Sequence, residues 1–176
     1  MLFLISSCAM KYWTIEGPFE LSNGLRVSIK TTAWSYYPSD LDRYVLPIYL
    51  EVENKGNEPV NIERYEVYLL DEKGNQFNLL EPKDVASLLR RSHSIGFSFG
   101  IGYWSSPIGI WWWPYYALPP REEAYPDILN KAFIFGQIQP KARLSGFVYF
   151  PRVPKGTKGL ILYVKGYSFS LKMRED

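Results

Sequence analysis

The sequence offers few side chains that could perform covalent or metal chemistry. It contains one histidine, His93, and one cysteine, Cys8. A Ser-His-Asp triad would have to use His93, which follows two arginines whose charge disfavours a protonated imidazole. We expect instead that His93 lies near the last carbonyl groups of a helix. One cysteine and one histidine also exclude a disulfide framework and a zinc site made from several such ligands.

Carboxylates lie close together in the sequence at two places, Asp40 with Asp42 and Glu122 with Glu123 and Asp127. Such groups could bind Ca²⁺ with help from carbonyl oxygens, or act as a pair in glycoside hydrolysis. We interpret them as solvated turn or cap residues, because a chain with 18 Asp and Glu residues offers many pairs of this kind. A glycine-rich phosphate loop is also absent from the sequence. The sequence therefore predicts a protein that is not an enzyme and has no metal or other cofactor.

Length and charge narrow the class of protein further. The 176 residues fit one domain, and a hydrophobic fraction of 47% is enough for a well-formed core. There are 20 Lys and Arg residues against 18 Asp and Glu, so the formal net charge is only +2. This charge balance lacks the strongly basic character of proteins that bind nucleic acid, and we expect no nucleic-acid partner.

The cysteine lies in a distinctive local sequence. Ile5-Ser6-Ser7-Cys8 resembles the bacterial lipobox, in which the cysteine is acylated and becomes the first residue of the mature chain. The resemblance implies that residues 1–7 are the end of a signal segment whose basic part precedes Met1. Residues 8–17 would then be the lipidated cysteine and a short linker. The alternative is an apolar N-terminus with an unmodified thiol.

Alternating apolar and polar residues predict short β-strands. In Leu25–Lys30 the apolar residues Leu25, Val27 and Ile29 would share one face. Pro47 cannot donate a ladder hydrogen bond, so we expect an edge or a bulge there. A break in the alternation near Arg64 predicts a bulge. The predicted strands cover about residues 25–31, 46–52, 60–69, 76–80, 141–150, 159–164 and 167–171.

Two helices interrupt this pattern. Residues 82–91 place Val85, Leu88 and Leu89 on one face, and residues 127–133 have a similar apolar face after a proline. We expect both helices to cover a sheet edge or one end of a sandwich. The chain would thus contain a domain over residues 18–176 with an insert over residues 81–135.

The most unusual segment is residues 94–120, which contains no charged side chain and most of the tryptophans. Its prolines and glycines argue against a single membrane-spanning helix. Four interpretations remain: an enlarged core, an interfacial membrane contact, a protein-binding patch, or a surface that stacks on glycans. The candidate contact residues, for a membrane or a partner, are Trp104, Trp111, Trp112, Trp113, Tyr115 and Tyr116.

Several strand and turn motifs are similar to those of a known module. Residues 49–54 end in Asn, residues 56–62 contain a Gly/Pro turn, and residues 68–74 end in Asp-x-x-Gly. Together with the Gly-Phe strand in residues 144–151, they resemble the immunoglobulin-like, or telokin-like, β-sandwich modules of bacterial surface lipoproteins. The resemblance covers residues 25–80 and 141–172. It implies an all-β, immunoglobulin-like antiparallel β-sandwich of about seven strands, with two short helices and an aromatic-rich insert.

These observations lead to one hypothesis and one alternative. The hypothesis is a non-enzymatic envelope lipoprotein, tethered to a membrane through acyl chains such as palmitate on Cys8, that binds an envelope protein or lipid through the insert. Ala9 resembles the sorting pattern for the outer membrane, so we expect the domain to face the periplasm or the cell surface. The alternative is a soluble carbohydrate-binding or enzyme accessory β-sandwich domain.

Overall fold

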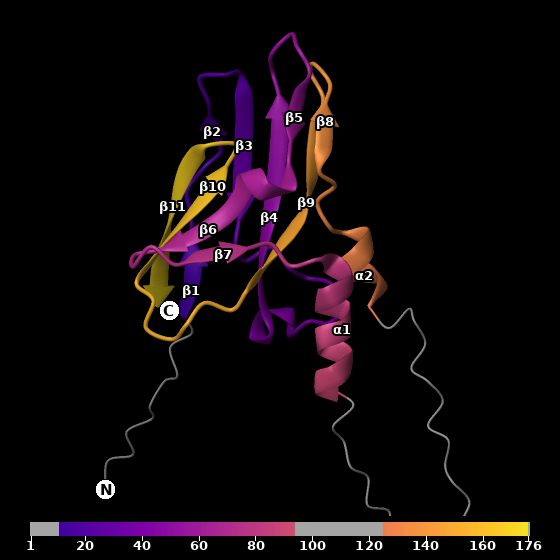
Figure 1. Ribbon diagram of the computed structural model, residues 1–176, viewed down its shortest axis with the longest axis vertical. Helices are drawn as coiled ribbons and strands as arrows, with labels where there is room; N and C mark the ends of the chain where they lie inside the picture. Colours follow the sequence, from indigo (N-terminus) through magenta and orange to yellow (C-terminus); the bar gives the residue numbers. More distant parts are fainter. Residues whose placement is uncertain (1–10, 94–124, 176) are drawn as a thin grey trace, which may run out of the picture.

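The computed structural model describes residues 11–93 and 125–175, and two antiparallel sheets pack face to face in it (Figure 1). Sheet A has the strand order β1-β11-β10-β6-β7, and sheet B has the order β2-β3-β4-β9. Sheet A contains β1 (Lys11–Thr14), β6 (Val67–Asp71), β7 (Gln76–Asn78), β10 (Gly159–Val164) and β11 (Tyr167–Glu175). Sheet B contains β2 (Phe19–Glu20), β3 (Leu25–Lys30), β4 (Val45–Asn54) and β9 (Arg143–Pro151).

The remaining elements are short. A separate two-stranded sheet pairs β5 (Val60–Ile62) with β8 (Gly136–Ile138). Two 3₁₀ turns, η1 (Leu41–Arg43) and η2 (Arg64–Glu66), lie next to strands β4 and β6. The two α-helices are α1 (Pro82–His93) and α2 (Pro126–Asn130). The expectation of an all-β antiparallel sandwich with two short helices is therefore confirmed.

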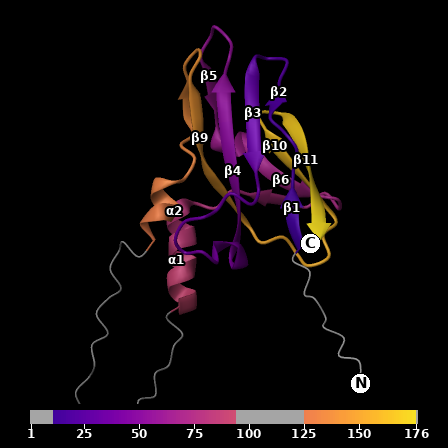
Figure 2. The same cartoon turned by 180° about the vertical axis from the view of Figure 1, so that it is seen from behind.

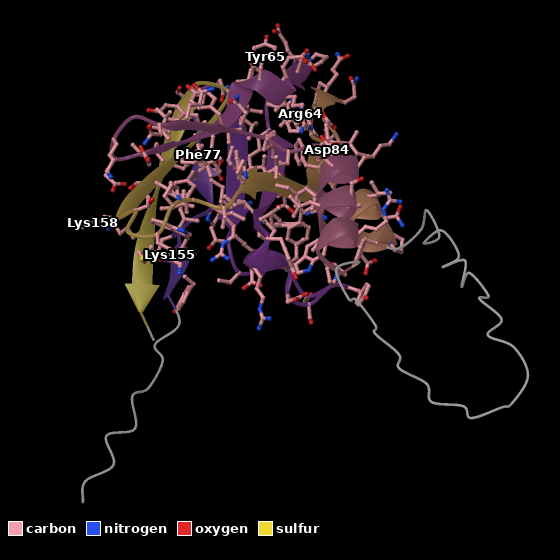
Figure 3. The ribbon with its side chains drawn as sticks, turned by 60° about the horizontal axis from the view of Figure 1, so that its bottom comes forward. Arg64, Tyr65, Phe77, Asp84, Lys155 and Lys158 are labelled. Atoms are coloured by element: carbon pink, nitrogen blue, oxygen red, sulfur yellow. The ribbon has the colours of Figure 1, made fainter. Side chains whose placement is uncertain are left out.

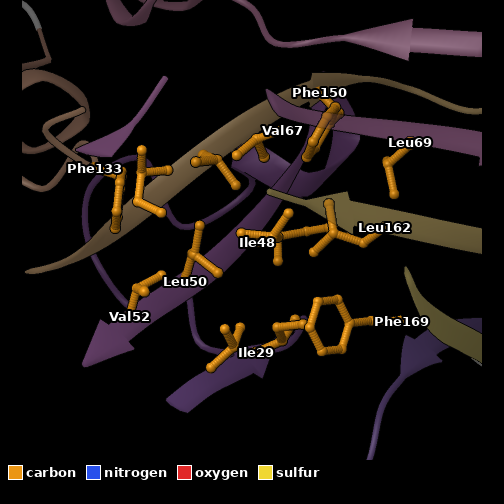
Figure 4. Close-up of a cluster of buried hydrophobic side chains, with 14 of the residues drawn as sticks. Ile29, Ile48, Leu50, Val52, Val67, Leu69, Phe133, Phe150, Leu162 and Phe169 are labelled. Atoms are coloured by element: carbon orange, nitrogen blue, oxygen red, sulfur yellow. The ribbon is translucent and has the colours of Figure 1, made fainter. Parts of the chain in front are cut away.

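The main core lies between the two sheets (Figure 4). Strand alternation sends one side chain in two toward it, so β3 contributes Leu25, Val27 and Ile29 as the sequence predicts. Sheet A faces them with residues such as Leu162 and Phe169. At ~25 cal/mol per Å² of buried apolar area, this shared interface is the main source of stability.

The structure has more strands than the expected seven. Each predicted strand has a counterpart, but the described residues also form β1, β2 and β8. Residues 60–69 are not one bulged strand, because β5 and β6 belong to different sheets. Between them η2 turns the chain, held by a capping box in which the Glu66 side chain accepts a hydrogen bond of 2.9 Å from the Glu63 N–H. The break in alternation near Arg64 therefore marks a change of sheet.

The predicted linker at residues 8–17 contains part of the fold. β1 forms an edge of sheet A, where Lys11 lies opposite Glu175 and Trp13 opposite Met173. Trp13 is buried in the main core, and its carbonyl oxygen accepts a hydrogen bond from the Thr31 hydroxyl. Alternation over four residues is too short to predict a strand, so β1 is recognisable only from its pairing with β11.

Pro47 lies where the ladder between β3 and β4 has already ended. The last pair of that ladder joins Lys30 to Tyr49, whereas Pro47 lies opposite Tyr149 of β9. The Tyr149 carbonyl accepts a hydrogen bond from the Leu80 N–H, so the main-chain polar groups of Tyr149 face away from β4. The missing N–H of Pro47 thus faces the side without a partner strand, which agrees with the expected local edge.

The helices form a layer along the β9 edge of sheet B (Figure 2), which agrees with the expectation that they cover a sheet edge. A second buried cluster holds this layer to the sheet. It joins residues of the loop and turn before β4, of both helices and of β9, namely Leu41, Val45, Val85, Leu89, Tyr125, Ile128, Phe147 and Tyr149. The sequence did not predict this second core.

The helical layer also covers the outer edge of β9. The Leu80 N–H donates to Tyr149 at 2.8 Å, and Phe147 both donates to Lys131 at 2.7 Å and accepts from Phe133 at 2.8 Å. α2 ends at Asn130 because Ala132 and Phe133 pair with β9 in this way. The outer edge of β9 is therefore covered at Phe147 and Tyr149, where another chain cannot pair with it.

Candidate functional site

The sequence-predicted site residues lie outside the described residues. These are Cys8, Trp104, Trp111, Trp112, Trp113, Tyr115 and Tyr116. Within the insert, the structure describes the residues on either side of 94–124, His93 at the end of α1 and Tyr125 before α2, and we call these two residues the roots of the insert. α1 and α2 pack against one another, so the two roots lie on the same part of the molecule.

Of the carboxylates considered for chemistry, Glu122 and Glu123 lie outside the described residues. Asp40 and Asp42 lie at and within η1, and Asp127 lies in the first turn of α2, where its Oδ2 accepts a hydrogen bond of 3.2 Å from the Tyr37 N–H. Within residues 11–93 and 125–175, no group of three or more His, Cys, Asp or Glu could hold a metal ion. None of the described helices is long and apolar enough to cross a bilayer.

The structure does reveal a cluster of aromatic rings beside the roots of the insert. Trp34 lies at its centre, with ring centroids 4.9 Å from Phe147 and 5.4 Å from Tyr36, both in edge-to-face geometry. The Trp34 indole N–H donates a hydrogen bond of 2.8 Å to the Pro38 carbonyl, which fixes the loop before β4. Edge-to-face pairs of this kind contribute ~0.5–1.5 kcal/mol each beyond their buried area.

Two tyrosines of this loop extend the cluster to the surface. Tyr37 is 63% exposed and stacks on Tyr125 with ring centroids 5.7 Å apart, directly beside the returning root. Tyr36 lies under the ammonium group of Lys131, whose Nζ is 4.9 Å from the ring centroid. These residues are not among the sites predicted from the sequence, although the aromatic run Trp34-Ser35-Tyr36-Tyr37-Pro38 is visible there.

The buried tyrosines beneath the helices have a structural role. The Tyr149 hydroxyl donates a hydrogen bond of 2.9 Å to the Ile128 carbonyl of α2. Burial, with a smaller effect from the Asp127 carboxylate, raises the pKa of Tyr149 well above its ordinary value. Burial also raises the pKa of Tyr125, with added repulsion from Tyr37. Both side chains therefore stay neutral at physiological pH.

One small cavity lies between the helical layer and the sandwich. It has a volume of about 10 Å³ and is lined by residues that include Arg64, Leu80, Phe133 and Tyr149. Arg64 forms an ion pair of 3.2 Å with Glu81 at its side. A cavity of this size holds about one water molecule, whereas a pocket for a small ligand needs roughly 300–1,000 Å³.

Exposed side chains lie close to both roots of the insert. Tyr37 and Leu88, the latter 45% exposed, belong to the loop and the helix that contribute to the second buried cluster. Comparison with protein-family models, with curated proteins and with solved structures finds no match to this chain.

Proposed function

We propose that the chain is a bacterial envelope lipoprotein, with an immunoglobulin-like sandwich that acts as a non-enzymatic binding or scaffolding module. Acyl groups on Cys8 would tether it to a membrane, and the aromatic insert would contact lipid or an envelope protein. A domain facing the periplasm or the cell surface from the outer membrane fits the residue after the cysteine.

The strand order supports the immunoglobulin-like assignment. In sheet A the order β11-β10-β6-β7 corresponds to strands G, F, C and C′ of such a sandwich, and β3-β4-β9 corresponds to A, B and E. The insert over residues 81–135 then falls between C′ and E, where the D strand would lie. The simple module is thereby enlarged at one connection.

The proposed tether is supported by the positions of two points where the chain enters or leaves the fold. β1 begins at Lys11, and α1 ends at His93, at the same end of the molecule in both views (Figures 1 and 2). We call this the lower end. An acylated Cys8 and the start of the insert would therefore both approach one surface, so the insert could reach lipid or a neighbouring membrane protein.

Membrane flotation of the protein expressed with its native upstream DNA tests the tether. The expected result is that the wild type floats and incorporates labelled palmitate, whereas Cys8→Ser incorporates no label and floats only weakly, through its remaining surface contacts. Ser7→Ala keeps a small residue before the cysteine and is the matched control, which should float like the wild type. A wild type that neither floats nor incorporates label would overturn the proposal.

The role of the insert has its own test. Trp111→Ala, Trp112→Ala and Trp113→Ala should abolish membrane or partner binding in the Cys8→Ser background and leave the melting temperature almost unchanged. If these rings belonged to a core, at least one substitution would lower the unfolding free energy by about 3–5 kcal/mol. That second result would remove the insert from the proposed contact surface.

A further inference from the structure

Basic side chains are grouped at the lower end of the molecule. Arg43 lies in η1, just before β4 begins, and Arg152 follows the end of β9, whose Pro151 lies opposite Val45. Arg152 Nη1 donates a hydrogen bond of 2.8 Å to the Arg43 carbonyl oxygen, so the two residues are held together. Lys155 lies in the same loop as Arg152 and is seen with the lower end brought forward in Figure 3.

These cations stand out by their place together at one end, since other described cations such as Lys30 and Arg143 also lack an ion pair. Arg43, Arg152 and Lys155 are exposed, and none forms an ion pair with a described carboxylate, although Asp40 and Asp42 lie at or in the same turn. Arg174, farther along the lower end, is paired with Glu16 at 3.0 Å. Away from this end, the ion pairs are Lys55–Glu20 at 2.7 Å, Lys165–Glu66 at 3.0 Å, Arg64–Glu81 at 3.2 Å, and Arg26 with Glu20 and Glu53.

The tether would hold this surface close to headgroups. Lys11 follows Cys8 after two intervening residues, and these three steps of the chain span at most about 10 Å. The Debye length at physiological ionic strength is roughly 8 Å, so charges at the lower end would remain within the field of an anionic leaflet. This step depends on the proposed acylation of Cys8.

We infer that the lower end is an electrostatic docking surface for anionic lipid headgroups, with Arg43, Arg152 and Lys155 contacting lipid phosphates. Each cation near an anionic leaflet strengthens binding by about fivefold. The exposed ring of Tyr37, beside the returning root of the insert, adds a group that favours the headgroup region. Docking fixes the orientation of the sandwich, which acyl chains alone leave free.

The test uses the full chain carrying Cys8→Ser, so that no acyl group contributes. Co-sedimentation is measured with phosphatidylcholine vesicles, with and without phosphatidylglycerol. Arg43→Glu with Lys155→Glu should weaken binding to the anionic vesicles by tenfold or more. The matched control, Lys55→Glu with Arg143→Glu, makes the same charge change where β4 ends and β9 begins, and should alter binding less than twofold.

Arg152 is left unchanged because its hydrogen bond supports the loop. Arg43→Gln with Lys155→Gln is a milder pair that should give a smaller loss, with an unchanged melting temperature. Equal losses for the lower pair and the control, equal binding to both vesicle types, or binding to neither would overturn the inference. Flotation of the acylated wild type tests the tether separately. The proposed acylation can therefore be supported while the docking surface is rejected, and the docking surface can be supported while the acylation is rejected.

Discussion

The hydroxyl group of Tyr149 donates a hydrogen bond of 2.9 Å to the carbonyl oxygen of Ile128. Tyr149 belongs to β9 and Ile128 to the five-residue helix α2, so this bond fixes the helix to the outer face of sheet B. Carbonyl groups near the end of a helix lack an intrahelical partner. A side chain from the sheet supplies that partner here.

Tyr149→Phe should therefore lower the unfolding free energy by about 1–3 kcal/mol, because it leaves the Ile128 carbonyl buried without a donor. Urea denaturation measures the loss. Tyr163→Phe is the control, since the Tyr163 ring stacks on Tyr68 with centroids 4.8 Å apart and should lose little. Equal stability of Tyr149→Phe and the wild type would show that the bond does not hold α2.

Gly146 marks a close approach between β9 and the segment after α2. A Cβ at this position would lie 2.6 Å from the main-chain N and Cα atoms of Phe133. Gly146→Ala should cost about 1–3 kcal/mol or more, because backbone atoms cannot move aside as a flexible side chain can. Gly159→Ala, where a Cβ meets nothing within 4 Å, is the control in a thermal melt. Similar melting temperatures for the two variants would contradict the geometry.

Asn54 ends β4 as a fully buried amide. Its Nδ2 donates to Glu58 O at 2.7 Å and to Ile138 O at 3.1 Å, and its Oδ1 accepts from Gly56 N at 3.0 Å. Asn54→Ala should reduce stability by about 2–4 kcal/mol, since several main-chain groups lose their partners. The exposed Asn57 in the same turn is the control, and Asn57→Ala should give a urea midpoint close to that of the wild type.

The two neighbouring leucines of α1 should respond differently to truncation. Leu89 is fully buried in the second core, whereas Leu88 is 45% exposed. Leu89→Ala should cost about 2–5 kcal/mol through lost burial and a residual cavity. Leu88→Ala should fall within about 0.5 kcal/mol of the wild type. Equal costs would mean that the helical layer does not pack on sheet B in solution.

Acid should weaken the hairpin between β6 and β7. The side chain of Asn75, followed by main-chain N–H groups of Asn75 and Lys73, holds the pKa of Asp71 below its ordinary value. A carboxyl group with a lowered folded-state pKa stabilises the protein fully above its unfolded pKa, and that stabilisation is lost as pH falls through the folded value. The stability of the wild type should thus decline below about pH 4.

A pH series of urea midpoints measures this decline, and Asn75→Ala supplies the comparison. The variant lacks the 2.7 Å bond from Asn75 Nδ2 to Asp71, so its stability should depend less steeply on acid pH. Asn78→Ala, on β7, should follow the wild type. Parallel curves for Asn75→Ala and the wild type would show that this hydrogen bond does not lower the pKa of Asp71.

Long strands with one buried face could be predicted from the sequence. In β3 and β4 the alternation continues over several residues, so the inward positions of Leu25, Val27 and Leu50 follow from the period of two. The shorter strands could not be predicted, because β2 and β8 contain two and three residues. β8 depends on β5, which is distant in sequence, whereas β2 pairs with the nearby β3 but is too short to show a pattern.

The aromatic cluster shows a second reason why local sequence patterns predict only part of the structure. Trp34 packs on Phe147, a residue far along the chain in another element, and neither neighbourhood indicates the other. The second buried core was equally hidden, since the outward-facing residues Tyr49 and Phe147 look like ordinary strand residues in the sequence. The roles proposed for Cys8 and for Trp111 to Trp113 remain predictions.

The covered edge of β9 has a mechanical consequence. Leu80 and Phe133, which bond to that edge, lie just before α1 and just after α2, so they flank the two helices and the residues between them. A pull on the insert would therefore load the bonds at Tyr149 and Phe147 first. The opposite edge of β9 is paired with β4 along its whole length, from Arg143 to Pro151. The force would be distributed over sheet B, and the core between the two sheets would not bear it directly.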